Sequence, residues 1–211
     1  MFFSIIIPCY NSEEYIEKCI NSVYENFSNE FSFEVIIIND GSKDKTLEIL
    51  NTISYKFKDL LVVNNKNFGP SFSRNIGINM AQGEYLLFLD SDDFYLKGTL
   101  IELYKYILNY QKPDVVEFNF SFIRKSIFKG KIKKINFTKA TTHALEGYNI
   151  NSVSNKSYKR SFLNENSIFF NEKLRLAEDL EFNTSVFLKA NNVLAIPNYF
   201  LKVNNLNFNS V

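Results

Sequence analysis

The sequence has few of the residues, and none of the long apolar runs, that mark several protein classes. Its two cysteines, Cys9 and Cys19, show neither metal-site spacing nor a disulfide framework, so we expect a reducing compartment. No apolar run approaches the length of about 18 residues that a membrane span needs. Met1 leads directly into a strand-like segment rather than a signal peptide. These absences predict a soluble, cytoplasmic protein, and we assign no role to the single histidine, His143.

Two common nucleotide-binding signatures are also missing. The chain contains neither G-x-x-x-x-G-K-[ST] nor G-x-G-x-x-G. A nucleotide bound to this protein must therefore be held by other residues.

The net charge is close to zero but unevenly placed. A formal charge of +1 argues against a global field for nucleic acid, and we expect no nucleic-acid partner. The stretch from Phe118 to Leu145 nevertheless has no acid and seven bases: Arg124, Lys125, Lys129, Lys131, Lys133, Lys134 and Lys139. Three interpretations of Arg124–Lys139 stay open: a solvated hairpin face, contact with an anionic acceptor, or peripheral docking to a membrane. Attraction to anionic lipids would contribute about 1 kcal/mol per Lys or Arg near the surface.

The first half of the chain alternates strand and helix four times. Strands that are apolar on both faces are typical of a mostly parallel sheet with helices on both sides. Right-handed crossovers then gather the carboxyl ends of the strands at one edge, where ligands bind in such sheets. The predicted strands are 2–7 (stopped by Pro8), 33–39, 60–64 and 85–89.

The helices of this half follow from apolar spacing. The first helix has Asn11 or Ser12 as its cap and one face formed by Ile16, Cys19, Ile20, Val23, Tyr24 and Phe27. A later helix begins at Pro70 and carries Ile76 and Met80.

The second half has a mixed pattern. It predicts helices over 97–110, 157–163 and 177–190, a strand over 114–120 followed by a hairpin turning near Lys129-Gly130, an extended segment at 167–170, and short strands at 193–196 and 199–203. In the helix over 177–190, Leu180, Val186 and Phe187 are expected on the apolar face, and Phe182 is less clearly assigned. Without a linker or repeat, this half is expected to pack on the first as one domain.

Three aspartates follow the fourth strand in "LLFLDSDDF". Like charges about 4 Å apart cost about 1 kcal/mol in water and about 4 kcal/mol at an effective dielectric of 20. If the strand continues, Asp90 and Asp92 face the same side, and their hard oxygens suit Mg²⁺ or Mn²⁺ together with phosphate oxygens. The alternative is that Asp92 or Asp93 caps the next segment. Three acids at this edge favour a metal or diphosphate site.

Other polar residues at this edge have both a binding and a structural interpretation. Asp40 can accept the imide hydrogen of uracil or form a plain Asp-Gly turn. Arg74 can contact a base or diphosphate, or be solvated, and Asn11 can bind or cap. Glu178 and Asp179 open a helix, where acids ordinarily complement the helix dipole.

Four blocks together resemble the inverting family 2 glycosyltransferases with the GT-A fold. They are "FSIIIPCYNSEEYIEKCINSV", "FEVIIINDGSKDKT", "FGPSFSRNIGINMAQGEYLLFLDSDDF" and, more weakly, "LRLAEDLEF". The resemblance implies a Rossmann-like, mostly parallel central sheet flanked by helices, with a smaller mixed acceptor-side region. Residues 1–112 would form the nucleotide-sugar-binding half, and residues 113–211 the half with the acceptor site and catalytic base.

The resemblance also implies roles for individual residues. Asp179 would be the catalytic base, supported by Glu178, and Asp92 would hold a divalent metal, Mn²⁺ or Mg²⁺, with Asp93 supporting the loop. The nucleotide-binding residues would be Pro8, Tyr10, Asn11, Asp40, Arg74, Asp90 and Ser91.

The implied function is transfer of a sugar from a nucleotide-diphosphate sugar, expected to be a UDP-sugar. The implied acceptor is a saccharide or lipid-linked saccharide in surface polysaccharide synthesis, at the inner face of the membrane. Two departures stand out. Asn39 replaces the first of the two acids usual before the Gly-Ser, and Lys202 is the only base in "YFLKVNNLNFNSV", where the family tends to place a basic or histidine-bearing segment over the diphosphate.

Three rival functions would require different sequence features. A nucleotidyltransferase would want a Gly-rich basic loop after the first strand, which "PCYNSEE" is not. A glycosidase can use paired carboxylates but needs no metal-type aspartate cluster. A non-catalytic nucleotide-sugar-binding module would bind donor and metal without transfer.

Overall fold

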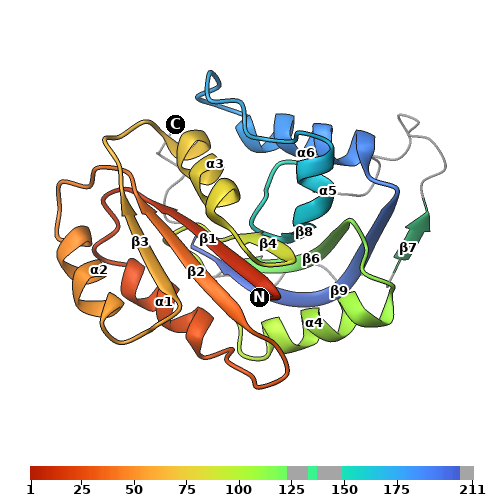
Figure 1. Cartoon of the computed structure of the whole chain (residues 1–211), viewed down its shortest axis with the longest axis horizontal. Coiled ribbons are helices and arrows are strands. Elements are labelled where there is room, and N and C mark those ends of the chain that lie inside the picture. Colours follow the sequence, from red (N-terminus) through yellow and green to blue (C-terminus); the bar gives the residue numbers. More distant parts are fainter. Residues whose placement is uncertain (123–132, 137–148, 205–211) are drawn as a thin grey trace.

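A single mixed sheet with helices on both faces forms the protein (Figure 1). The computed structural model describes residues 1–122, 133–136 and 149–204. The strands are β1 (Phe3–Cys9), β2 (Phe33–Asn39), β3 (Leu60–Asn64), β4 (Tyr85–Phe88), β5 (Phe94–Tyr95), β6 (Val115–Phe122), β7 (Lys133–Asn136), β8 (Lys156–Lys159) and β9 (Asn192–Val203). The helices are α1 (Ile16–Tyr24), α2 (Thr46–Ser54), α3 (Pro70–Met80), α4 (Thr99–Asn109), α5 (Arg160–Glu165) and α6 (Glu178–Lys189).

The strand order is β3-β2-β1-β4-β8-β6-β9-β5, with β7 paired to β9. Strands β1 to β4 are parallel, as predicted, and β8 inserts antiparallel between β4 and β6. Two apolar cores separate the layers. Helices α1, α2 and α4 contribute to the core on one face, and α3, α5 and α6 to the core on the other. The carboxyl ends of β1, β2 and β4 therefore open at one edge beneath the start of α3.

The first strand runs further than its sequence predicts. Pro8 lies within β1, opposite Ile38 of β2, and does not stop the strand. The carbonyl of Ile6 accepts the N–H of Leu89, so Pro8, two residues on, also faces the β4 side. Because β4 has already ended at Phe88, no partner there requires the N–H that proline lacks.

The predicted start of the first helix is also wrong. Helix α1 begins at Ile16, and neither Asn11 nor Ser12 caps it with a side chain. The Asn11 Oδ1 instead accepts the N–H of Lys43 at 2.8 Å. Phe27, predicted on the buried face, lies beyond the helix and is 69 % exposed.

Several elements of the second half differ from their predictions. The turn of the predicted hairpin lies outside the described residues, but β7 pairs with β9 rather than with β6, whose own partners are β8 and β9. The segment 157–163 is the end of β8 followed by α5, and 167–170 is not a strand. The two predicted short strands form the single strand β9. In α6, Phe182 is fully buried, whereas Leu180 is 36 % exposed.

Close packing of α3 on β1 depends on Gly77. A Cβ added there would lie 2.3 Å from Cγ2 of Ile6, so the helix would have to move away from the strand. We expect Gly77→Ala to lower the free energy of unfolding by about 1–3 kcal/mol, as overpacked cores do. Urea denaturation measures this loss as a lower midpoint with an unchanged slope.

Two further variants make that measurement specific. The loss should shrink in an Ile6→Ala background, which removes the clashing atoms, whereas Asn79→Ala at an exposed position of α3 should leave stability nearly unchanged. A Gly77→Ala midpoint equal to wild type would show that α3 does not need this close approach.

Candidate functional site

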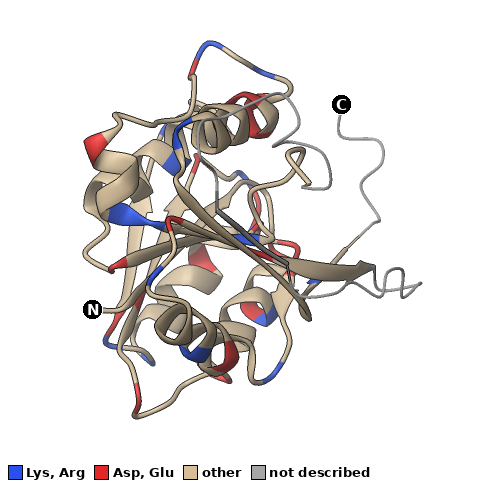
Figure 2. Cartoon of the chain, turned by 90° about the vertical axis from the view of Figure 1, so that its right-hand side faces the viewer, with Lys and Arg blue, Asp and Glu red and all other residues tan. Residues whose placement is uncertain are grey.

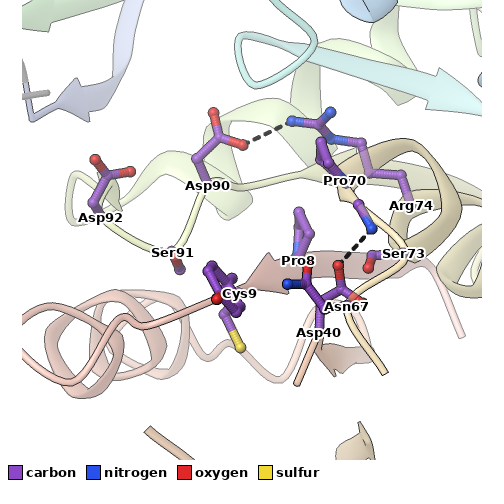
Figure 3. A pocket seen from close by; sticks show the side chains of 12 residues that line it. Pro8, Cys9, Asp40, Asn67, Pro70, Ser73, Arg74, Asp90, Ser91 and Asp92 are labelled. Atoms are coloured by element: carbon purple, nitrogen blue, oxygen red, sulfur yellow. Dashed lines mark hydrogen bonds and ion pairs between the residues drawn. The ribbon is translucent and has the colours of Figure 1, made fainter. Parts of the chain in front are cut away.

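An open pocket of about 220 Å³ lies at the carboxyl edge of the sheet (Figure 3). Its walls come from the ends of β1, β2 and β4 and from the segment entering α3. The lining residues are Pro8, Cys9, Tyr10, Asp40, Asn67, Gly69, Pro70, Ser73, Arg74, Asp90, Ser91 and Asp92. Polar groups that lie far apart in the sequence are thus brought together as the strand alternation predicts.

Asp40 braces one wall of this pocket. Its Oδ1 accepts the N–H of Phe68 at 2.9 Å, and its Oδ2 accepts the N–H of Gly69 at 2.7 Å. Gly69 has a φ of 98°, a conformation that glycine adopts without steric cost. A carboxylate offers about four acceptor positions, so Asp40 holds the entry to α3 and retains capacity for a ligand donor.

The three aspartates have three different environments. Asp90 is a bridge, because its Oδ1 lies 3.0 Å from Nη2 of Arg74 and its Oδ2 accepts the Ser154 hydroxyl at 2.9 Å. Asp93 is buried, and its Oδ1 accepts the N–H of Asn204 at 2.9 Å. Burial raises the pKa of Asp93 well above that of a free carboxyl, and the charges of Asp90 and Asp92 add to the rise.

Asp92 is the carboxylate that remains for a ligand. Burial and the charge of Asp90 raise the pKa of Asp92, so a cation beside it would be favourable. The prediction that Asp90 and Asp92 face the same side assumed that the strand continues through them. That assumption is wrong, because β4 ends at Phe88 and a turn follows. Figure 3 nevertheless shows the carboxylates of Asp90 and Asp92 on the same side of the loop.

The carboxylates of the pocket fit a divalent cation whose other ligands would be phosphate oxygens of a bound substrate and water. No group of three or more His, Cys, Asp or Glu side chains is arranged to hold a metal within the described ranges. Mg²⁺ commonly binds through one or two carboxylates plus substrate phosphates and water. Asp92 can supply such a carboxylate, while Asp90 and Asp93 are occupied by protein donors.

Arg74 connects the pocket to the start of α6. Arg74 is 5 % exposed, and its guanidinium lies 3.0 Å from Asp90, 3.4 Å from Glu178 and 3.3 Å from Asp179. Burial acts to lower the Arg74 pKa, but the charges of Asp179, Asp90 and Glu178 together outweigh it and raise the pKa. The interpretation of Arg74 as a solvated arginine is therefore wrong.

Asp179 is held in a defined orientation at the first turn of α6. Its Oδ2 accepts the N–H of Val153 at 3.1 Å, while its Oδ1 faces Arg74. Burial raises the Asp179 pKa, Arg74 opposes that rise, and Asp90 and Glu178 add to it, which gives a pKa of about 6. A carboxylate with such a pKa can act as a general base near neutral pH.

The sequence did not indicate the loop formed by residues 149–155. This loop provides the Val153 N–H to Asp179 and the Ser154 hydroxyl to Asp90. It contains no motif, and its contacts join residues 26 and 64 positions apart in the chain. Cys9, Asn67, Pro70 and Ser73 also line the pocket without having been proposed from sequence.

The remaining predicted site residues have varied positions. Ser91 and Tyr10 line the pocket, and the Ser91 hydroxyl lies 2.7 Å from that of Ser12. Asn11 does not line it. Asn39, where the family usually has an acid, is buried and donates to Oδ1 of Asn64 at 3.0 Å, so this substitution lies outside the pocket lining.

Figure 2 shows that Lys and Arg positions are interspersed with Asp and Glu positions along the described chain. Within Arg124–Lys139 only residues 133–136 are described, as the backbone of β7, so the side chains of this basic segment lie outside the described residues, as does His143. None of the helices in the described part of the chain is long and apolar enough to cross a bilayer.

The fold and site together define an α/β protein with an acidic pocket at the ends of its parallel strands. The family model described as glycosyl transferase family 2 matches residues 4–167, which is more than half of the chain. The chain therefore belongs to glycosyl transferase family 2.

Relatives and solved structures support the same family. The poly(ribitol-phosphate) beta-glucosyltransferase of Bacillus spizizenii is 31 % identical over 205 residues, covering 94 % of this chain and 31 % of that protein. The poly(ribitol-phosphate) beta-N-acetylglucosaminyltransferase TarS of Staphylococcus aureus is 32 % identical over 202 residues, covering 92 % and 34 %. This chain thus spans about a third of the length of these curated relatives.

Crystal structures of S. aureus TarS 1–349 in complex with UDP and with UDP-GlcNAc both match at a TM-score of 0.84 and 30 % identity. They cover 97 % of this chain and 60 % and 58 % of those chains. The expectation of a central sheet flanked by helices, of the GT-A type, is confirmed by this likeness.

Proposed function

We propose that this protein transfers a sugar from a nucleotide-diphosphate sugar to a saccharide or lipid-linked saccharide acceptor, with inversion at the anomeric carbon. The observation that carries the proposal is the buried Arg74, which joins Asp90 of the pocket to Asp179 at the start of α6. One guanidinium thereby fixes a donor-side acid and a candidate base relative to each other. Membership of glycosyl transferase family 2 supports the reaction class.

Asp179 is proposed as the base. Its carboxylate accepts the proton of an acceptor hydroxyl as that oxygen bonds to the anomeric carbon, and the bond from this carbon to the diphosphate breaks. Attack opposite the leaving group inverts the configuration. A base must lie within about 3 Å of the proton donor, and the contacts from Arg74 and Val153 hold Asp179 in one orientation for that approach.

The pocket is proposed to hold the donor. Tyr10, Pro8 and Asp40 would surround the uracil ring of the donor, and Asp90 would contact its ribose. A divalent cation, Mn²⁺ or Mg²⁺, held by Asp92 and the diphosphate would stabilise the negative charge of the leaving group. The relatives solved with UDP and UDP-GlcNAc support a UDP-sugar as the donor, and those named for poly(ribitol-phosphate) support a surface-polymer acceptor.

A panel of nucleotide sugars tests the proposal. The protein is incubated with UDP-, GDP- and ADP-sugars and Mn²⁺, and nucleotide release is measured with and without saccharide acceptors. We expect release from a UDP-sugar, including slow hydrolysis without acceptor. Thermal stabilisation by UDP-sugars without any release would instead indicate the non-catalytic binding module.

The pH dependence of the reaction should follow Asp179. A base works deprotonated, so kcat/KM should fall as pH drops through the Asp179 pKa of about 6. The loss should approach tenfold per pH unit below that value, because kcat/KM reports the essential groups of the free enzyme. Initial rates of UDP release between pH 4.5 and 8, at saturating metal, measure the profile. Full activity maintained down to pH 4.5 would contradict the assignment of Asp179.

A further inference from the structure

The loop 149–155 contacts both the donor side and the base side of the site. Val153 donates its N–H to Asp179 at 3.1 Å, and Ser154 donates its hydroxyl to Asp90 at 2.9 Å. Both loop residues are buried, with exposures of 0 % and 2 %. A shift of this loop would therefore change the position of Asp179 relative to Asp90.

The loop is anchored from beneath by Lys156, the first residue of β8. Its side chain is fully buried, and its Nζ donates to the carbonyl oxygens of Asn149 and Ser152 and to Oδ1 of Asn155. The Ser152 and Asn155 bonds are 2.7 and 3.0 Å long. One ammonium group thus bonds the beginning, the middle and the end of the loop.

Two further buried side chains hold the same loop. Glu117 lies 3.7 Å from Nζ of Lys156, and its Oε1 accepts the N–H of Asn149 at 2.8 Å. Asn183 on α6 donates to the carbonyl oxygens of Ile150 and Ser152. Since α6 also carries Asp179, these contacts bind the loop to the helix that presents the base.

Burying an ammonium group costs desolvation free energy that an apolar side chain of similar size would not cost. Replacing a buried ion pair with apolar residues of similar volume is often neutral or stabilising, so stability alone gives little reason for a charge at this position. Burial lowers the Lys156 pKa to about 8, and the neighbouring Glu117 opposes that fall. The three acceptors around Nζ match the three N–H groups of the ammonium form.

We propose that Lys156 is a positioning residue, which fixes loop 149–155 so that Val153 and Ser154 orient Asp179 and Asp90 for transfer. The assignment rests on the proposed transfer function. Lys156 touches no reacting atom and acts only through the loop.

Loss of the anchor should change catalysis more than donor binding. We expect Lys156→Met to lower kcat by about 10²-fold, a typical effect of a small misplacement of catalytic groups. The UDP dissociation constant should stay within about twofold of wild type, because Arg74 still holds Asp90 on the donor side. The ascending limb of the pH profile should move to higher pH, because the N–H that stabilises the Asp179 carboxylate would be displaced. The charged groups that face Asp179 are Arg74, Asp90, Glu178 and Lys156.

The decisive variant is Glu117→Gln combined with Lys156→Met, which removes both buried charges and leaves no unpaired ion. Lys159→Met on the same strand, at a half-buried position, is the matched control. Hydrogen exchange of peptides covering 149–155, UDP binding and kcat are measured on each. We expect faster exchange of the loop and reduced kcat in both Lys156 variants and wild-type values in the control.

The outcomes separate this inference from the proposed function. Wild-type protein without transfer or hydrolysis would count against the proposed function, whereas faster loop exchange without loss of UDP binding would still show the anchor. A folded double variant with wild-type kcat, pH profile and loop exchange would overturn the role of Lys156 alone. Failure of both Lys156 variants to fold would make Lys156 a folding residue and would overturn the positioning assignment.

Discussion

Asp179→Asn should lower kcat by about 10²- to 10⁴-fold, the usual contribution of a positioned general base. The amide cannot accept the proton of an acceptor hydroxyl, yet it keeps an oxygen to accept the Val153 N–H that Asp179 accepts now. Donor binding should be largely preserved, because Asp179 does not line the pocket. Single-turnover transfer from a UDP-sugar measures the rate, and calorimetric titration with UDP measures the binding.

Glu181→Gln is the matched control for that variant. Glu181 lies in the same first turn of α6, so this change removes one negative charge near the helix start without touching Arg74 or Val153. Glu181 is half-buried and is not one of the carboxylates that pair with Arg74, so the kcat of this variant should stay within about threefold of wild type. A near-normal rate for Asp179→Asn would reject Asp179 as the base.

Arg74→Met should combine a loss of stability with a loss of activity. Arg74 is 5 % exposed, and its guanidinium lies near three carboxylates, so its removal leaves a cluster of uncompensated acids. Breaking a buried ion pair from one side costs about 3–5 kcal/mol; since the side chain of Asp90 is 40 % exposed, we expect a loss of about 3 kcal/mol. Urea unfolding at pH 7.5 measures it.

The same variant should shift the pH dependence of any remaining activity. Arg74 lowers the Asp179 pKa, while Asp90 and Glu178 raise it. Without Arg74 the raised pKa should increase further, so the ascending limb should move above pH 6 and kcat/KM at pH 7 should fall by at least about 10²-fold. Arg160→Met, an arginine whose Nε donates to the carbonyl of Gly83, should leave kcat/KM near wild type. Equal effects of the two substitutions would show that Arg74 has no special place in the site.

The first half of the fold was largely predictable from local patterns. Short β-branched runs bounded by polar residues gave β2 and β3 at their observed bounds, and Pro70 marked the start of α3. The errors came from long-range context. A proline inside β1 is tolerated because β4 ends early, and β9 is one strand because β6 lies along almost its whole length. In both cases the deciding feature lies in another strand, so the local sequence could not show it.

The site was predictable in its location more than in its contacts. The carboxyl edge of a parallel sheet gathers Pro8, Asp40, Asp90 and Asp92 by topology alone, and the structure places all of them in one pocket. Spacing could not show which aspartate stays available. That depends on donors from elsewhere in the chain: Arg74 and Ser154 for Asp90, and Asn204 for Asp93.

The acceptor half shows why single residues in it were harder to assign. Glu178 and Asp179 look like ordinary acids at a helix start, and only Arg74, 104 and 105 positions away, distinguishes them. Lys156 and Glu117 look like surface charges in the sequence, yet both are buried beneath loop 149–155. Burial of a polar network depends on the whole packing, which local propensity does not encode.

A crystal structure of this chain with UDP and Mn²⁺ would show whether the pocket holds the donor. We expect the uracil beside Tyr10 and Asp40, the ribose at Asp90, and the ion joining the diphosphate to Asp92. A structure in which the pocket stays empty at saturating UDP, with the Asp92 carboxylate turned to solvent, would contradict this expectation.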